Sequence, residues 1–199
     1  MDELNFFLLI AIVLMFLSIF LWAQNSVRGR THHSTVPFRA GEYSQAHFLN
    51  RIVLWGFFLR LSIVILFNIT DAIRVLHLSP DSLRYHRVGR AIAQKMEQGM
   101  FNWPNWIDNG WFQFTGFVYY LFGSYPQIIQ LINITLGALT PVIVYYMLRK
   151  VYADERVARW TAVFTSFFPS FIYWSCLMLK DPLSIFSMSL LLLAVVSIR

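Results

Sequence analysis

Two aspartates and three cations are the residues of this chain whose types could together perform chemistry. Asp81 begins a polar segment, and Asp181 lies next to Lys180 between two apolar segments. Arg60 and Arg84 are further cations that could lie near these acids. A carboxylate can take the proton from a hydroxyl, and cations can stabilise a phosphate that leaves. This set of residues therefore indicates group transfer with departure of a phosphate, at a lipid surface.

The same residues also have a structural interpretation. Asp81 can stabilise a helix N-terminus through the helix dipole, and an aspartate before a proline, as at Asp181, is typical of a helix cap. Arg60 lies in the middle of an apolar segment, where it can bind a ligand or form a buried ion pair that only fixes helix packing. The residues alone leave the chemical and the structural interpretations open.

Other catalytic and metal-binding patterns are absent from the sequence. It contains no Gly-rich phosphate loop, nucleophile elbow, HExxH motif or Asp-x-Asp pair. The single cysteine, Cys176, excludes an internal disulfide and a Cys-based metal cluster, and the pair of His32 and His33 has no spaced partner. We therefore predict no metal site, although Asp81 and Asp181 could share a divalent cation. The sequence does not identify a cofactor.

The composition is that of an integral membrane protein. Hydrophobic residues make up 57% of the 199-residue chain and charged residues 13%, which is far from the values of a soluble domain. The formal net charge of +6 suits contact with anionic lipid head groups. Nucleic acid is the weaker interpretation, because the basic residues lie between apolar segments. We expect an all-α, polytopic transmembrane protein.

Apolar segments of about 20 residues are long enough to cross a membrane as helices. Five are predicted, at residues 4–23, 52–69, 126–148, 160–179 and 183–198. Asp2 and Glu3 precede the first segment, which argues against a cleaved signal peptide. Pro169 lies inside the fourth segment and predicts a kink there.

The basic residues indicate which ends of these spans face the cytoplasm. Residues 24–50 carry three arginines, and residues 149–159 carry three arginines and a lysine, so both segments are predicted to be cytoplasmic. One crossing from the first of these segments places residues 70–110 on the outer face, and the turn at Lys180 and Asp181 falls on the same side. Both candidate acids are thus expected at one outer surface.

The polar segment that contains Asp81 is predicted to be an amphipathic helix on the membrane surface. Ser79 is a suitable N-cap, Pro80 suits the first helical position and Gly99 suits the exit. One stripe of this helix comprises Asp81, Tyr85, Val88, Ile92 and Met96. The tryptophans that follow this helix, Trp103, Trp106 and Trp111, favour an interfacial aromatic belt over a sugar-stacking platform. Residues 111–122 are too short to span and are predicted to form a re-entrant or surface helix.

The order of several motifs resembles that of the GT-C membrane glycosyltransferases. Arg60 in a span, followed by Pro80-Asp81-Ser82 and Tyr85-His86, is similar to the first outer loop of that family. Later motifs resemble the next spans and the next outer turn: Tyr120-Leu121-Phe122-Gly123, Ile132-Asn133, Gly137-Ala138-Leu139, Val144-Tyr145-Tyr146, Phe168-Pro169-Ser170 and Leu179-Lys180-Asp181-Pro182. The likeness covers residues 54–197 and is closest to the branch that uses polyprenyl-phosphate sugars. This branch includes protein mannosyltransferases and the bacterial lipid A aminoarabinose transferase.

The resemblance implies a multi-pass hexosyl- or pentosyltransferase of the bacterial inner membrane. Such an enzyme of the cell envelope moves a sugar from a polyprenyl-phosphate donor to a glycan, lipid or protein acceptor on the periplasmic face. By this resemblance Asp81 inherits the role of catalytic acid/base and Asp181 a supporting catalytic role. The implied substrate-binding residues are Arg60, Arg84, Tyr85, His86 and Lys180.

The domain organisation leaves a second interpretation. Residues 1–50 are predicted to form an N-terminal span and a basic cytoplasmic loop with no counterpart in the family, and residues 51–199 a GT-C-like membrane module whose outer loop is 70–110. The chain stops directly after an apolar segment, so we expect this module to be incomplete. The alternative is a non-catalytic or truncated membrane subunit that binds polyprenyl lipid or a partner protein.

Overall fold

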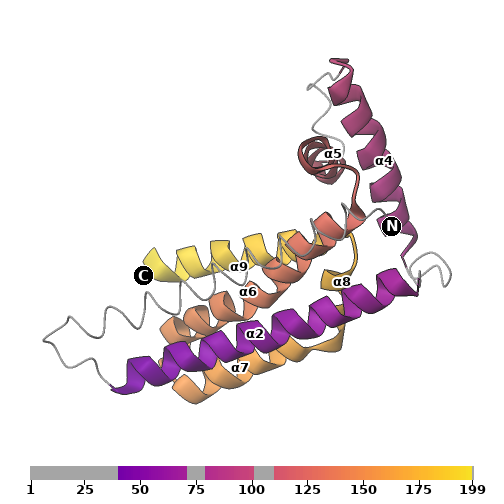
Figure 1. The fold of residues 1–199 in the computed structure, drawn as a ribbon. Helices are drawn as coiled ribbons and strands as arrows, with labels where there is room; N and C mark the ends of the chain where they lie inside the picture. The colour runs from indigo at the N-terminus through magenta and orange to yellow at the C-terminus, as the bar shows by residue number, and fades with distance from the viewer. Residues whose placement is uncertain (1–39, 71–78, 101–109, 199) are drawn as a thin grey trace, which may run out of the picture. The chain divides into compact units, whose positions relative to one another are not determined.

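The computed structural model describes residues 40–70, 79–100 and 110–198, and the side chains from residue 45 onward within these ranges. All regular secondary structure in these ranges is helical, which confirms the predicted all-α class. The helices, shown in Figure 1, are α2 (Ala40–Ile69), α4 (Pro80–Glu97), α5 (Gly110–Phe122), α6 (Pro126–Tyr152), α7 (Glu155–Phe167), α8 (Pro169–Cys176) and α9 (Asp181–Ile198).

The chain divides into two compact units, Met1–Asn50 and Arg51–Arg199. In the first unit only residues 40–50 are described, and they form the beginning of α2. These residues belong to the segment predicted to be a cytoplasmic loop, so the last part of that segment is helical. The predicted first span, at residues 4–23, lies outside the described residues. The helix packing and the sites described below belong to the second unit.

Among the described helices, three are long and apolar enough to cross a membrane: Gln45–Ile69, Pro126–Tyr152 and Asp181–Ile198. They correspond to the second, third and fifth predicted spans. At a rise of about 1.5 Å per residue, the longest of them extends about 40 Å, which exceeds the thickness of a hydrocarbon core. The chain is therefore a membrane protein with several membrane-capable helices.

The fourth predicted span, at residues 160–179, is not one helix. The backbone of Phe168 is extended, with φ −64° and ψ 122°, and it separates α7 from α8. Pro169 begins α8, because proline disfavours the helical conformation in the preceding residue and cannot donate a hydrogen bond to the preceding turn. Neither helix alone is long enough to cross, so the count of five spans is not confirmed.

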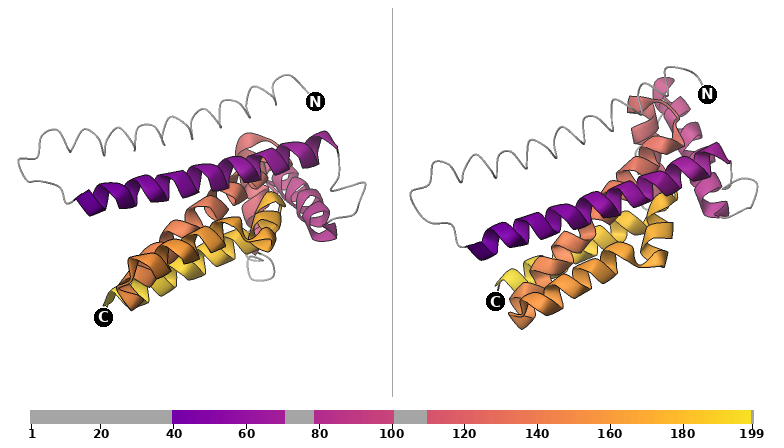
Figure 2. Two further views of the ribbon diagram at one scale, coloured as in Figure 1. Left: turned by 90° about the horizontal axis from the view of Figure 1, so that it is seen from below. Right: turned by 60° about the horizontal axis from the view of Figure 1, so that its bottom comes forward.

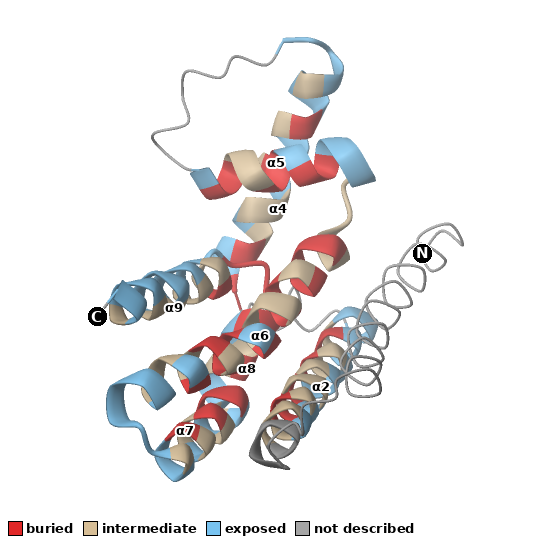
Figure 3. Cartoon of the chain, turned by 90° about the vertical axis from the view of Figure 1, so that its left-hand side faces the viewer, coloured by how far each residue is buried: buried red, intermediate tan, exposed pale blue. Residues whose placement is uncertain are grey.

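Helix α6 is the central helix of the second unit. It packs against α7, α8 and α9, and buried residues occur along most of its length (Figure 3). By contrast, α9 buries only Pro182 and exposes large apolar residues such as Leu191. A helix that is apolar on all sides and mostly exposed fits contact with lipid.

Helices α4 and α5 form a pair at the end of the bundle where α6 begins (Figure 1, Figure 2). The pair approaches closely at Gly89 and Gly116, since a Cβ on Gly89 would overlap Thr115 and one on Gly116 would overlap Ile92. The buried residues of α4 are Ser82, Gly89 and Ala93. Each of these buried residues directly follows a residue of the predicted stripe in the sequence. The buried face packs against α5.

Candidate functional site

A cavity of about 580 Å³ lies where the N-terminal ends of α4 and α9 meet α8. Its polar wall contains both predicted acids, Asp81 and Asp181, together with Lys180 and Tyr85. The remaining lining residues are Ser79, Pro80, Ser170, Phe171, Trp174, Leu179 and Ile185. The cavity is therefore lined by charged residues together with aromatic and apolar ones.

The N-terminus of α4 places Asp81 in the wall of this cavity. The Ser79 hydroxyl accepts a hydrogen bond from the Ser82 amide, Pro80 is at the first helical position and Asp81 follows it. The Ser82 hydroxyl in turn accepts a hydrogen bond of 3.3 Å from the amide of Met178, which lies 96 residues further along the chain. This contact links the start of α4 to residues 177–180 and so brings the two acids to one cavity.

Two buried amide side chains of α6 hold the segment that carries Lys180 and Asp181. The Asn133 side-chain nitrogen donates to the carbonyl oxygens of Leu177 and Leu179, both at 2.8 Å, and the Gln130 side chain donates to the Cys176 carbonyl at 3.1 Å. Carbonyl groups at a helix C-terminus have no partner within the helix, so a side-chain donor satisfies them. The backbone between α8 and α9 is thereby fixed to α6.

Gln130 and Asn133 were missed as site residues by the sequence reasoning, although Asn133 is part of a family-like motif. The available signal was two amides three residues apart, which lie on one face of a helix, inside an apolar span. Polar residues inside a membrane span face other parts of the protein, and here they face the α8–α9 segment.

His86 and Tyr119 connect α4 to α5. The Tyr119 hydroxyl lies 2.9 Å from Nδ1 of His86 and donates to the sulfur of Met178 at 3.4 Å. Burial raises the pKa of the Tyr119 hydroxyl, so this hydroxyl stays protonated. His86 therefore acts on the packing of α4, α5 and residue 178, and it is not among the residues that line the cavity.

Arg84 also faces α5. Its guanidinium carbon lies 5.7 Å from the centroid of the Phe112 ring, which is the geometry of a cation–π contact. Arg84 does not line the cavity. Tyr85 does line it, and its ring packs edge-on against Trp111 and at a tilt against Phe112.

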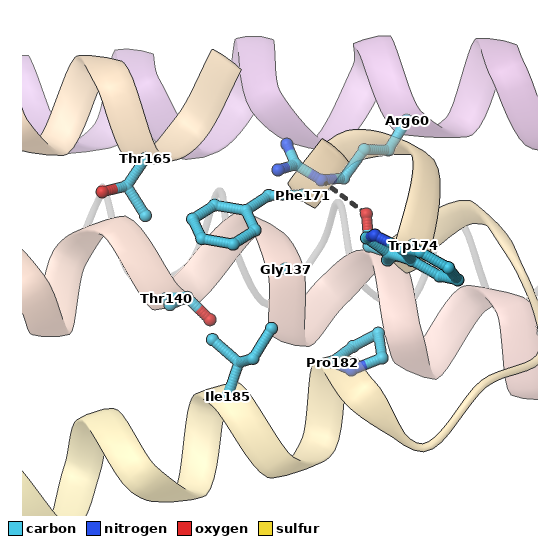
Figure 4. A pocket seen from close by; sticks show the side chains of 9 residues that line it. Arg60, Gly137, Thr140, Thr165, Phe171, Trp174, Pro182 and Ile185 are labelled. Atoms are coloured by element: carbon cyan, nitrogen blue, oxygen red, sulfur yellow. Dashed lines mark hydrogen bonds between the residues drawn. The ribbon is translucent and has the colours of Figure 1, made fainter. Parts of the chain in front are cut away.

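Arg60 lies in a separate, smaller pocket of about 20 Å³ (Figure 4). Its Nε donates to the Ser175 hydroxyl and its Nη1 to the Gly56 carbonyl, both at 2.9 Å. Both partners are neutral, and no salt bridge to Arg60 occurs among the side chains that the structure describes. The smaller pocket shares Phe171, Trp174 and Ile185 with the larger cavity. The predicted set is thus divided: Asp81, Asp181, Tyr85 and Lys180 line one cavity, whereas Arg60, Arg84 and His86 do not.

This arrangement suits an amphipathic substrate. Carboxylates can serve as a base or orient a hydroxyl, an ammonium can hold a phosphate, and an aromatic wall can accept a hydrocarbon chain or a sugar ring. Among the described residues there is no group of three or more His, Cys, Asp or Glu side chains that could hold a metal ion.

The fold and the cavity define a polytopic α-helical membrane protein with two acids at one end of its membrane helices. The family model described as dolichyl-phosphate-mannose-protein mannosyltransferase matches residues 105–198, just under half of the chain. This match confirms the resemblance to GT-C enzymes and supports membrane glycosyltransferase activity in general. The matched range includes Lys180 and Asp181, and Asp81 precedes it. Searches of curated proteins and of solved structures returned no match.

Proposed function

We propose that this chain contributes the reaction site of a glycosyltransferase that moves a sugar from a polyprenyl-phosphate donor to an acceptor hydroxyl or amine. The observation that carries the proposal is the meeting of Asp81, Asp181 and Lys180 in one cavity that aromatic and apolar residues also line. A lipid-linked sugar phosphate likewise combines a charged and an apolar part. The cavity also lies at the first residue of the membrane-capable helix α9.

In the proposed reaction Asp81 is the general base. It takes the proton from the acceptor, the acceptor oxygen or nitrogen forms a bond to the anomeric carbon of the sugar, and the bond from that carbon to the phosphate oxygen breaks. The electron pair leaves with polyprenyl phosphate, whose charge Lys180 stabilises. Asp181 orients the acceptor or the donor, and Tyr85 contacts the substrate. The predicted binding roles of Arg84 and His86 become packing roles in this proposal.

We place this reaction on the outer face of the bacterial inner membrane. Arg149 and Arg159 pair with Glu155 at the opposite end of α6, and Arg156 lies in the same segment. By the positive-inside rule the end rich in arginine faces the cytoplasm, so the cavity end faces outward. Acceptors on this face are glycans, lipids or proteins of the cell envelope.

The test is reconstitution of the chain in liposomes with a panel of polyprenyl-phosphate sugars that carry radiolabelled mannose, glucose or arabinose. Release of polyprenyl phosphate together with labelled product in the presence of envelope acceptors is the expected result. The matched control is the double variant Asp81→Asn with Asp181→Asn, which should bind donor and give no product.

The alternative is a membrane subunit that binds polyprenyl lipid or a partner protein without catalysis. The exposed apolar faces of α2 and α9 favour it, since Trp55 and Leu191 are 69% and 59% exposed. Saturable donor binding with no turnover for any sugar, unchanged in the double variant, would support this alternative over the enzyme.

A further inference from the structure

The pocket around Arg60 contains a buried positive charge that the proposed reaction does not use. Arg60 is 0% exposed and lies in the middle of the membrane-capable helix α2. An arginine keeps its charge inside a protein, and an uncompensated charge at this depth of a membrane is strongly unfavourable. The pocket therefore needs a source of negative charge.

The described neighbours of Arg60 do not supply that charge. Its two hydrogen-bond acceptors are the Ser175 hydroxyl and the Gly56 carbonyl, both neutral. The Ser175 hydroxyl donates its own hydrogen to the Ile172 carbonyl at 2.8 Å. The Nη2 nitrogen of Arg60 is buried and has no hydrogen-bond partner among the described residues. One end of the guanidinium is thus without a partner.

The unpaired end points into the pocket. In Figure 4 the terminal guanidinium nitrogens point away from Trp174, toward the space between Thr165 and Phe171. Thr140 and Thr165 are among the residues that line this pocket, and the Thr140 hydroxyl donates to the Leu136 carbonyl. A second buried polar group without a described partner, the Ser166 hydroxyl, lies close to Gly56. The free N–H groups of Nη2 therefore face a pocket that no described side chain fills.

Two glycines keep the space around the guanidinium open. A Cβ on Gly137 would lie 3.1 Å from Nε of Arg60 and 2.9 Å from Cβ of Ser175, and one on Gly56 would lie 2.6 Å from the Ser166 hydroxyl. Any side chain at either position would press on the guanidinium or on a hydroxyl beside it. The sequence thus combines a mid-membrane arginine with small residues on two neighbouring helices.

The size of the pocket restricts its occupant. A volume of about 20 Å³ holds one water molecule or one ion of similar size. A phosphate ester with its four oxygens is larger than this. Water could satisfy the free N–H groups, but only an anion would also balance the charge. We propose that the Arg60 pocket binds a single small monovalent anion of the size of chloride. This site adjoins the reaction cavity through Phe171, Trp174 and Ile185, and the proposed transfer reaction does not use it.

The experiment is thermal unfolding of the purified full chain in nanodiscs, in equimolar sodium chloride, bromide and gluconate. A ligand that binds only the folded state raises the melting temperature by mass action, so chloride and bromide should each give a Tm about 5 °C above that in gluconate. Arg60→Met should abolish this difference. Arg87→Gln, which removes an exposed arginine of α4, should retain it.

A second variant keeps the arginine and tests the pocket itself. Gly137→Ala adds a methyl group to the pocket lining, 3.1 Å from Nε of Arg60, so half-saturation should need a chloride concentration several times higher. Gly110→Ala, which has open space around the new methyl group, should behave as the unmodified chain. Equal Tm values in all three salts, or a halide effect that persists in Arg60→Met, would overturn the proposal. Neither outcome bears on sugar transfer, which is measured separately.

Discussion

Asp81 and Asp181 line the same cavity but have different surroundings. Asp81 is exposed on the second residue of α4, whereas Asp181 is half-buried on the first residue of α9, between Lys180 and Pro182. An exposed carboxylate is free to approach an acceptor, and one adjacent to a lysine is better placed to orient a charged group. The proposed base is therefore Asp81, with Asp181 in support.

Asp81→Asn removes the base and keeps the size of the side chain and much of its capping ability. We expect sugar transfer to fall by about a hundredfold or more, with little change in unfolding temperature. Asp181→Asn should reduce transfer less. The measurement is product formation in liposomes, with Asp154→Asn as control, because Asp154 caps α7. Full transfer by Asp81→Asn would show that Asp81 is not the base and that α4 is only a surface element.

Asn133 is a second residue whose effect can be predicted, because both hydrogens of its amide bind backbone carbonyls. Asn133→Leu would leave the Leu177 and Leu179 carbonyls without these donors, at about 1–3 kcal/mol for each buried acceptor. We expect lower stability and a larger loss of transfer than the stability alone explains, since Lys180 and Asp181 would shift.

Chemical denaturation and transfer are measured on the same preparation of Asn133→Leu. The control is Gln127→Ala, six residues before Asn133 on α6, which removes an exposed hydrogen bond to Asn68. Normal stability and normal transfer in Asn133→Leu would mean that the α8–α9 segment is held by other contacts.

At the scale of the elements, the α4–α5 pair depends on two glycines at the place where the helices approach. Gly89→Ala should destabilise this pair, because the new methyl group overlaps the Thr115 side chain. Overpacking of this kind costs about 1–3 kcal/mol. We expect faster hydrogen exchange in both helices and little change in α6.

Two further variants separate this contact from helix propensity. Thr115→Ser removes the methyl group that overlaps, so it should partly rescue Gly89→Ala. Gly110→Ala has open space around the new methyl group and should leave hydrogen exchange unchanged. If the amides of α4 and α5 exchanged as slowly in Gly89→Ala as in the unmodified chain, the close approach of the two helices would be contradicted.

At the scale of the whole molecule, the charge distribution predicts the orientation in the membrane. Gln98 caps the C-terminus of α4, whose N-terminus lines the cavity, and Tyr152 ends α6, next to the arginine-rich segment. In sealed right-side-out vesicles, Gln98→Cys should react with an impermeant thiol reagent and Tyr152→Cys should not. The native Cys176 is buried and gives a low background. The opposite pattern would reverse the assignment of both faces.

The sequence by itself was sufficient for the class of protein and for several helix boundaries. Apolar length predicted the spans at α2, α6 and α9, because a membrane span needs only a local run of apolar residues. The start of α4 was equally readable, since Ser79 and Pro80 act on the backbone of the same turn. Pro169 predicts a kink, and the structure has a complete break there: Phe168 is extended and Pro169 begins α8, which packs against α6.

Only the tertiary structure decided which of the predicted site residues meet. The Ser82 hydroxyl and the Asn133 amide bring Asp81 and Asp181 to one cavity through hydrogen bonds to backbone groups far away in the sequence. Arg84 was expected beside the acids, and the Phe112 ring of α5 holds it instead. The periodicity of one helix states which residues share a face, but the choice of the neighbouring helix depends on close packing at positions such as Gly89 and Gly116.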